Sequence, residues 1–208
     1  MQLLRISQCL VTLLASLGLA SCQMAVSMYE GPDAGFAVAS IAVAPDSTYE
    51  NVQFDFRDRD RNTDSYLFRV NNADLVSPET DFHTAGAKGG VATIRLRPGQ
   101  YEFYSFAVQN DDRGYTPRFA YSIPFTIEPG KVTYLGQFLT LGVLKDGVFG
   151  AAVLGEPYFV ISNQQTRDLT LATKKTPELV GASVISAVPN PTTLRAPYFR
   201  ATALPTKH

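Results

Sequence analysis

Leu96-Arg97-Pro98-Gly99-Gln100-Tyr101 sets the architecture of this chain, because it places a turn between two predicted β-strands and an aromatic residue just beyond it. Proline pre-sets φ and glycine supplies positive φ, so Pro-Gly favours a type II turn. Tight hairpins prefer the primed turns instead. We therefore expect this Pro-Gly to form a corner between two sheets. Ile127-Glu128-Pro129-Gly130-Lys131-Val132 repeats the pattern.

Alternating apolar and polar residues surround both turns. The alternating apolar positions are Ile41 and Val43; Val52, Phe54 and Phe56; Tyr66, Phe68 and Val70; Ile94 and Leu96; and Phe119, Tyr121, Ile123, Phe125 and Ile127. A period of two indicates strands with one buried face. Many such strands, separated by Gly, Pro, Asn and Asp, predict a mainly β fold and an antiparallel sandwich or barrel. We expect this domain to span residues 38–162.

The C-terminal part predicts one short helix. Ser162 followed three residues later by Gln165 is a capping-box pattern, and Pro177 ends the segment, so we expect a helix over roughly Asn163–Lys175. We expect it to pack at one end of the sandwich, with partner binding as the alternative role. Val184–Val188 predicts a last strand, so residues 163–188 hold the helix and that strand. Residues 189–208 are proline-rich and predict an extended or mobile tail.

The Leu-x-Pro-Gly-x-Tyr motif at Leu96–Tyr101 resembles the tyrosine corner of immunoglobulin-like and fibronectin-type sandwiches. A similar motif occurs in transthyretin-like domains. The wider pattern, over Leu96–Phe106, Ile127–Phe138 and Tyr158–Leu179, resembles a group of uncharacterised bacterial lipoproteins with a single sandwich domain of this kind. The resemblance implies an immunoglobulin/transthyretin-like β-sandwich, and it transfers no catalytic residue.

The N-terminus predicts an export signal with an attachment site. Arg5 precedes an apolar run from Cys9 to Ala20, which is too short to span a membrane and matches a signal peptide over residues 1–21. Leu19-Ala20-Ser21-Cys22 resembles the lipobox of bacterial lipoproteins. The resemblance implies cleavage before Cys22, acylation of Cys22 and, with Gln23 next, an outer-membrane location facing the periplasm. An ordinary secretory signal is the alternative. Residues 22–37 are expected to form a tether.

Composition limits the classes of function. The chain has 18 Lys and Arg against 19 Asp and Glu. Removal of residues 1–21 would remove one charged residue, Arg5. A nearly neutral chain has no basic field for nucleic acid or anionic lipid, so membrane contact must come from an anchor. Cys9 and Cys22 are the two cysteines. We therefore expect no disulfide and no thiolate metal site in the mature domain. Its 13 Phe and 10 Tyr must then supply the core.

Three stretches invite a chemical interpretation. Asp58–Asp64 begins like a calcium loop, but Thr63 and Arg69 occupy positions that require Gly and Glu, so an ion-paired strand end is favoured. Gly86-Ala87-Lys88-Gly89-Gly90 precedes a strand rather than a helix, which favours a flexible loop over a phosphate site. His83 has no nucleophile elbow to pair with and is expected to be solvent-exposed.

Tyr101, Phe103, Tyr104 and Phe106 place aromatic rings on both faces of one predicted strand. Either the strand is packed on both sides, or its outer face offers rings to a glycan or protein. The function that we expect is a non-catalytic binding or scaffolding role in the cell envelope, with no cofactor and no metal. The alternatives are a carbohydrate- or peptidoglycan-binding module, marked by an exposed aromatic row, and a hydrolase with two acids in a cleft.

Overall fold

The computed structural model describes residues 29–45, 47, 49, 51–61, 63–71, 80–110, 113–146, 152–194 and 196–203. The predicted signal peptide and Cys22 lie outside them. The elements run in the order β1 (Gly35–Val43), β2 (Asn51–Asp58), β3 (Thr63–Asn71), β4 (Phe82–His83), β5 (Lys88–Leu96), β6 (Gly99–Asn110), β7 (Arg113–Tyr115), β8 (Ile123–Ile127), β9 (Val132–Asp146), β10 (Ala152–Ser162), α2 (Gln165–Lys175), the 3₁₀ turn η2 (Pro177–Leu179), β11 (Val184–Ser186) and β12 (Phe199–Arg200).

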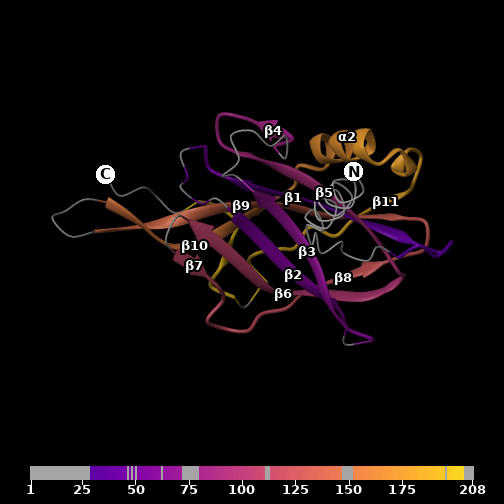
Figure 1. Cartoon of the computed structure of the whole chain (residues 1–208), viewed down its shortest axis with the longest axis horizontal. Coiled ribbons are helices and arrows are strands. Elements are labelled where there is room, and N and C mark those ends of the chain that lie inside the picture. Colours follow the sequence, from indigo (N-terminus) through magenta and orange to yellow (C-terminus); the bar gives the residue numbers. More distant parts are fainter. Residues whose placement is uncertain are drawn as a thin grey trace, which may run out of the picture.

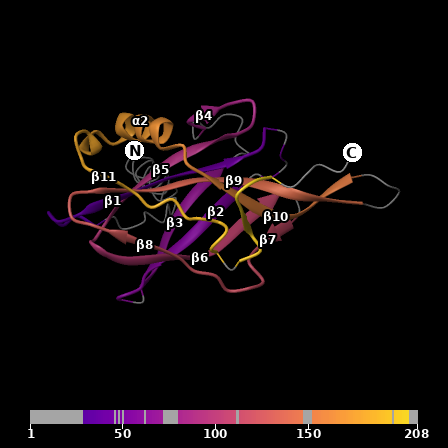
Figure 2. The same ribbon diagram turned by 180° about the vertical axis from the view of Figure 1, so that it is seen from behind.

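The described residues form two open sheets (Figures 1 and 2). The seven-stranded sheet has the order β12-β10-β9-β1-β5-β4, with β11 also paired to β9. The five-stranded sheet has the order β3-β2-β6-β7, with β8 also paired to β6. The mainly β class predicted from the alternation is confirmed.

The antiparallel expectation holds for the five-stranded sheet and is wrong for the other one. In the seven-stranded sheet, β1 pairs in parallel with β9, β11 with β9, and β12 with β10. Alternation alone reports which face of a strand is buried and not the direction of its neighbour, because both ladder types place successive side chains on opposite faces.

Aromatic side chains from both sheets fill one core between them. Phe54 of β2 lies at its centre, and its ring centroid is 4.8 Å from that of Phe138 on β9 and 4.6 Å from that of Phe159 on β10. Phe103 and Phe106 of β6 also contact Phe54. Large rings bury much area per residue, so these contacts supply the cohesion of the fold.

Both Pro-Gly turns carry the chain from one sheet to the other, as predicted for the first of them. Pro98-Gly99 links β5 to β6, and Pro129-Gly130 links β8 to β9. Gly130 has φ of 65°, which fits the third position of a type II turn. The Tyr101 hydroxyl donates a hydrogen bond to the Arg97 carbonyl at 2.8 Å, four residues upstream.

A β-bulge explains the aromatic run of β6. Phe56 pairs with Phe103 while Asp55 pairs with Ser105, so Tyr104 is the extra residue. The bulge turns Phe106 to the same core face as Tyr101 and Phe103, and each of the three is 1% exposed. The expected division of the rings between two faces is therefore wrong: Tyr101, Phe103 and Phe106 lie on the core face, and Tyr104 is half-buried beneath the Arg57 guanidinium.

Helix α2 covers the outer face of the seven-stranded sheet, not one end of the fold as expected (Figure 1). Ala172 is fully buried and Leu169 packs beside it, against an outer cluster that includes Phe36, Val38 and Val132. The predicted capping box is absent: the Gln165 N–H donates to the Asn163 side chain at 3.0 Å, and the helix starts two residues later than expected. The strand predicted after the helix is present as β11.

Three further segments differ from expectation. The alternation predicted Phe119 on a buried face, but β8 begins only at Ile123 and Phe119 is 65% exposed. Lys88–Gly90 belongs to β5 rather than to a loop; a Cβ on Gly89 would lie 2.1 Å from the Ile41 carbonyl, so the glycine allows close strand contact. The expected tail supplies β12, whose Phe199 is 5% exposed, because its apolar residues add to an existing sheet instead of forming a core alone.

Candidate functional site

A buried polar network joins α2 to the seven-stranded sheet. The Asp168 carboxylate is fully buried. Its Oδ2 accepts hydrogen bonds from the Ser40 hydroxyl of β1 and the Tyr134 hydroxyl of β9, both at 2.7 Å. Its Oδ1 accepts from Arg167 Nε at 2.8 Å and Nη2 at 2.6 Å. Four donors therefore satisfy the two carboxylate oxygens of Asp168.

The remaining groups of this network are engaged as well. Arg167 Nη2 donates to Gln137 Oε1 at 2.8 Å, and the Arg167 guanidinium carbon lies 3.6 Å from the centroid of the Phe82 ring. The Tyr134 hydroxyl also accepts the Gln164 N–H at 3.0 Å. Burial, followed by the hydrogen bond to Asp168, raises the pKa of Tyr134 above its ordinary value of about 10. The network is suited to fixing the helix in place.

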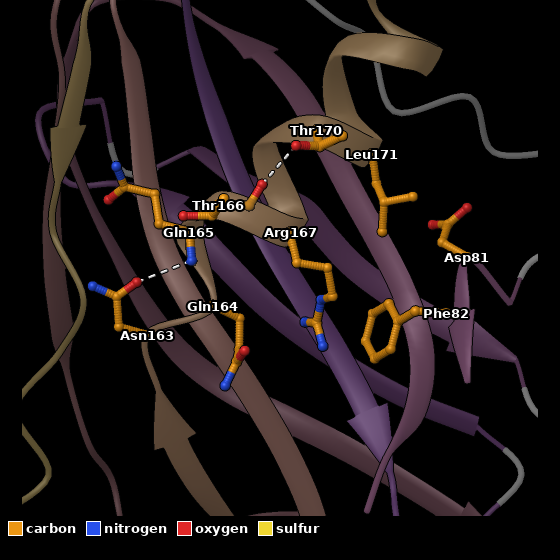
Figure 3. A pocket seen from close by; sticks show the side chains of 9 residues that line it. All are labelled: Asp81, Phe82, Asn163, Gln164, Gln165, Thr166, Arg167, Thr170 and Leu171. Carbon is orange, nitrogen blue, oxygen red and sulfur yellow. Dashed lines mark hydrogen bonds between the residues drawn. The ribbon is translucent and has the colours of Figure 1, made fainter. Parts of the chain in front are cut away.

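An open depression of about 810 Å³ includes Arg167 of this network in its lining (Figure 3). Polar residues at the start of α2, including Asn163, Gln164 and Thr166, form one wall, and Asp81 and Phe82 form the other. Asp81 is paired with Lys175 at 2.5 Å and is the one carboxylate in the described lining. Figure 3 shows Arg167 pointing from the helix toward Phe82, and the charge of Arg167 is already paired with Asp168.

A second concavity, which we call the aromatic groove, has a volume of about 480 Å³ and lies where the two sheets come to an edge. β7 ends the five-stranded sheet on one side, and β10 and β12 end the seven-stranded sheet on the other. The groove is lined by Phe106, Gly114, Tyr115, Thr116, Arg118, Phe119, Glu156, Pro157, Tyr158, Pro197, Tyr198 and Arg200. The Tyr198 hydroxyl accepts the Phe119 N–H at 2.7 Å and ties its two walls together.

The charged side chains of the aromatic groove make fewer hydrogen bonds and ion pairs, among the described residues, than those around Asp168. Arg118 and Glu156 pair at 2.9 Å, but their side chains are 76% and 49% exposed, so the pair contributes little. Arg200 lies over the Tyr158 ring, 5.5 Å from its centroid. The buried Nε of Arg200 has no hydrogen-bond partner among the described residues. Glu156 is the one carboxylate in the described lining.

The aromatic groove lies far from the point where the described chain enters the fold. Phe36, near the start of β1, pairs with Val132 at the start of β9. Pro157, in the groove, pairs with Gly142 on the same strand. Ten residues of strand separate Val132 from Gly142, which corresponds to about 30 Å. Figure 1 accordingly shows β7 and β10 at one end of the molecule and β11 at the other.

Of the described residues that the sequence suggested for metal binding, phosphate binding or catalysis, none lines either concavity, whereas Phe106 and Phe119 of the predicted strands line the aromatic groove. The predicted lipidation site, Cys22, lies outside the described residues. His83 is exposed on β4, as predicted. Asp58 closes the β2–β3 turn, where its carboxylate accepts from the Asp60 and Arg61 N–H groups and pairs with the Arg61 guanidinium at 2.6 Å. In the described part of the chain, no three His, Cys, Asp or Glu residues are grouped to hold a metal ion.

Sequence reasoning missed the groove residues because most of them come from segments taken as strand or tail. Phe119 was expected in a strand, and Tyr198 and Arg200 in a mobile tail. One signal was available: the adjacent rings of Tyr198-Phe199 are unusual in a disordered segment, which is poor in aromatic residues. Asp168 carried no signal, because one acidic residue in the first turn of a helix is ordinary.

Comparisons with known proteins leave the family open. No protein-family model matches the chain, and no curated protein matches it. Among solved structures, a leucine-rich repeat protein from Bacteroides thetaiotaomicron VPI-5482 is similar at 12% identity and a TM-score of 0.31. That match covers 52% of this chain and 14% of the other, and it supports no argument about fold or function. Within the described residues, no helix has the length and apolar character to cross a membrane.

Proposed function

We propose that this protein is a lipid-anchored protein of the outer membrane that faces the periplasm and binds another envelope component without catalysis. Leu19-Ala20-Ser21-Cys22 and the near-neutral charge support the anchor. The position of the aromatic groove carries the binding role: about 30 Å of β9 separates it from the start of β1. An anchor attached before β1 would leave the groove directed away from the bilayer.

Replacement of Cys22 tests the anchor. Acyl chains contribute about 0.8 kcal/mol per buried CH₂, so C22S should move the protein from the membrane fraction to the soluble fraction after a high-salt wash. C9S is the matched control, since Cys9 lies in the segment expected to be removed, and it should fractionate like the wild type. Mass spectrometry of the mature N-terminus should show acylated Cys22; an unmodified Cys22 or cleavage elsewhere would refute the anchor.

Site-specific crosslinking in cells tests the binding role. A photoreactive residue at Phe119, on the rim of the groove, should form a discrete adduct with an envelope component. The same residue at Val180, which is 72% exposed next to η2, is the control and should form none. Equal labelling from both positions would contradict a binding site at the groove.

The rings of the groove favour one particular class of partner, a glycan. Tyr and Phe faces pack against the apolar faces of sugar rings, and Phe119 is 65% exposed. One exposed ring is less than the exposed aromatic row predicted for a carbohydrate- or peptidoglycan-binding module, but together with the polar residues of the lining it supports that candidate. Co-sedimentation with purified peptidoglycan, or calorimetry with soluble oligosaccharides, should detect binding in the wild type and lose it in F119A.

We also propose that the two sheets form a sandwich related to transthyretin-like and fibronectin-type domains. The hydrogen bond from Tyr101 to Arg97 and the placement of both Pro-Gly turns between the sheets support this assignment. An experimental structure in which Tyr101 makes no bond to upstream backbone would argue against it.

A further inference from the structure

We infer that the aromatic groove binds a saccharide that carries a carboxylate, such as a uronic acid or a muramic acid residue. The sugar face would lie on Phe119 and the carboxylate at Arg200. This inference rests on the glycan-binding function proposed above and adds a requirement for negative charge in the ligand. Its basis is the state of Arg200, the charge of the lining and the exposure of Phe119.

Arg200 has no anionic partner among the described residues of the fold. Its guanidinium lies over Tyr158, and its Nε is buried without an acceptor in that part of the chain. Because Nε is buried, a ligand carboxylate would accept from the Nη groups of this guanidinium, which form strong charge-assisted hydrogen bonds. The Arg167 guanidinium shows the alternative arrangement in the same molecule, because Asp168 accepts from both its Nε and Nη2.

The charges of the lining complement an anion. Among the described lining residues, three carry a charged side chain: Arg118, Glu156 and Arg200. Glu156 is balanced by Arg118, so Arg200 leaves one net positive charge. The Arg118–Glu156 pair is largely exposed and easily opened, which frees a second guanidinium for the ligand. A neutral ligand would leave Arg200 as it is.

The rings explain why the anion should be part of a saccharide. Phe119 offers an exposed ring, and the half-buried Tyr115 and Tyr198 line the same groove. A sugar acid presents an apolar ring face, hydroxyl groups and a carboxylate within one residue. A simple inorganic anion would use Arg200 and leave the rings without a role.

Isothermal titration calorimetry on the mature domain tests the inference with matched ligands. The probes are hexagalacturonate, hexaguluronate and a muramic-acid-containing peptidoglycan disaccharide, each compared with its methyl ester. At least one acid should bind, and its ester should bind about tenfold more weakly, because the charge-assisted bonds are lost. Binding of the acid should also weaken as salt is raised.

Single substitutions distinguish the contribution of Arg200 and Arg118 to binding from any effect on folding. R200Q and R118Q should each reduce acid binding, with R200Q giving a loss of about tenfold and less discrimination between acid and ester. R97Q is the matched control: Arg97 also lies over a tyrosine ring, that of Tyr29, but outside the groove, and R97Q should bind as the wild type does. R118Q changes an exposed side chain and keeps the test valid if R200Q fails to fold.

The outcomes are distinguishable. Preference for the acid that disappears in R200Q supports the inference. Equal binding of acid and ester, abolished by F119A, overturns the requirement for charge and leaves glycan binding in place. Binding of none of the probes overturns both.

Discussion

The network around Asp168 and the aromatic groove use the same kinds of side chain in opposite ways. Around Asp168, an arginine, a tyrosine and a serine direct their donors at one buried carboxylate. In the groove, Arg200 has no carboxylate partner within the described part of the chain, and Phe119 is 65% exposed. The difference indicates two roles: the closed network holds elements together, whereas the exposed ring and the arginine of the groove are available to a ligand.

The largest predicted effect comes from opening the closed network. D168A leaves Arg167 charged and partly buried without its carboxylate, and it removes the acceptor of Ser40 and Tyr134. We expect a loss of about 3–5 kcal/mol in the free energy of unfolding, measured by urea denaturation of the mature domain.

A double variant provides the control for this prediction. Adding R167M to D168A removes the uncompensated cation, so the double variant should be more stable than D168A alone. A loss below about 1 kcal/mol in D168A would show that water replaces the carboxylate, and the network would then not be closed.

The second largest effect on stability is expected when a tyrosine hydroxyl of the closed network is removed, compared with a tyrosine hydroxyl in the groove. Y134F removes a hydroxyl that donates to Asp168 and accepts the Gln164 N–H, so we expect a loss of about 1–3 kcal/mol. Y115F, in the groove, removes a half-buried hydroxyl and should change the free energy of unfolding by less than about 0.5 kcal/mol. Similar losses in the two variants would erase the distinction between the regions.

Alkaline pH should weaken the closed network. The pKa of Tyr134 in the folded state is raised above its ordinary value of about 10, chiefly by burial. The stabilising contribution of the neutral phenol is therefore fully present below about pH 10 and is lost as the pH rises above that value. Unfolding free energies measured from pH 8 to 11 should fall above about pH 10, and they should fall less steeply in Y134F. Burial also raises the pKa of Tyr49 and Tyr121, so a residual slope is expected.

The smallest predicted effect on stability lies in the groove. Phe119 is 65% exposed, so F119A should alter the free energy of unfolding by less than about 0.5 kcal/mol. The same change should abolish ligand binding at the groove. A loss of stability above about 1 kcal/mol, seen in urea denaturation, would assign Phe119 to the packed core instead.

Local patterns were enough to predict most strands, the helix and the corner at Pro98-Gly99. Period-two alternation marks a buried face, and Pro-Gly restricts φ, so each signal lies within a few residues. The pairing of β1 with β9 and the bulge at Tyr104 depend on contacts between distant segments. From the sequence alone, Tyr101 to Phe106 look like a regular strand with aromatic residues on both faces. The bulge becomes evident only when the pairing of β6 with β2 is known.

Neither concavity could be predicted from the sequence. Asp168 meets Ser40 and Tyr134 only after α2 folds back over the sheet. The groove forms where residues near 115, 157 and 199 come together at the sheet edges, and no motif joins these three segments. Phe119 followed the alternating pattern yet falls outside β8, so the pattern there was coincidental.

The pairing of β12 with β10 has a consequence for the order of assembly. β12 contributes Phe199 to an interior that also includes residues of β1, so the earliest and latest described strands close a single core. The polypeptide cannot seal that interior until Phe199 has joined the strands near its N-terminal end, and its parallel pairings add slow, long-range steps. Chains that end before Phe199 would leave phenylalanine rings uncovered, and we expect proteases and chaperones to recognise them as unfinished.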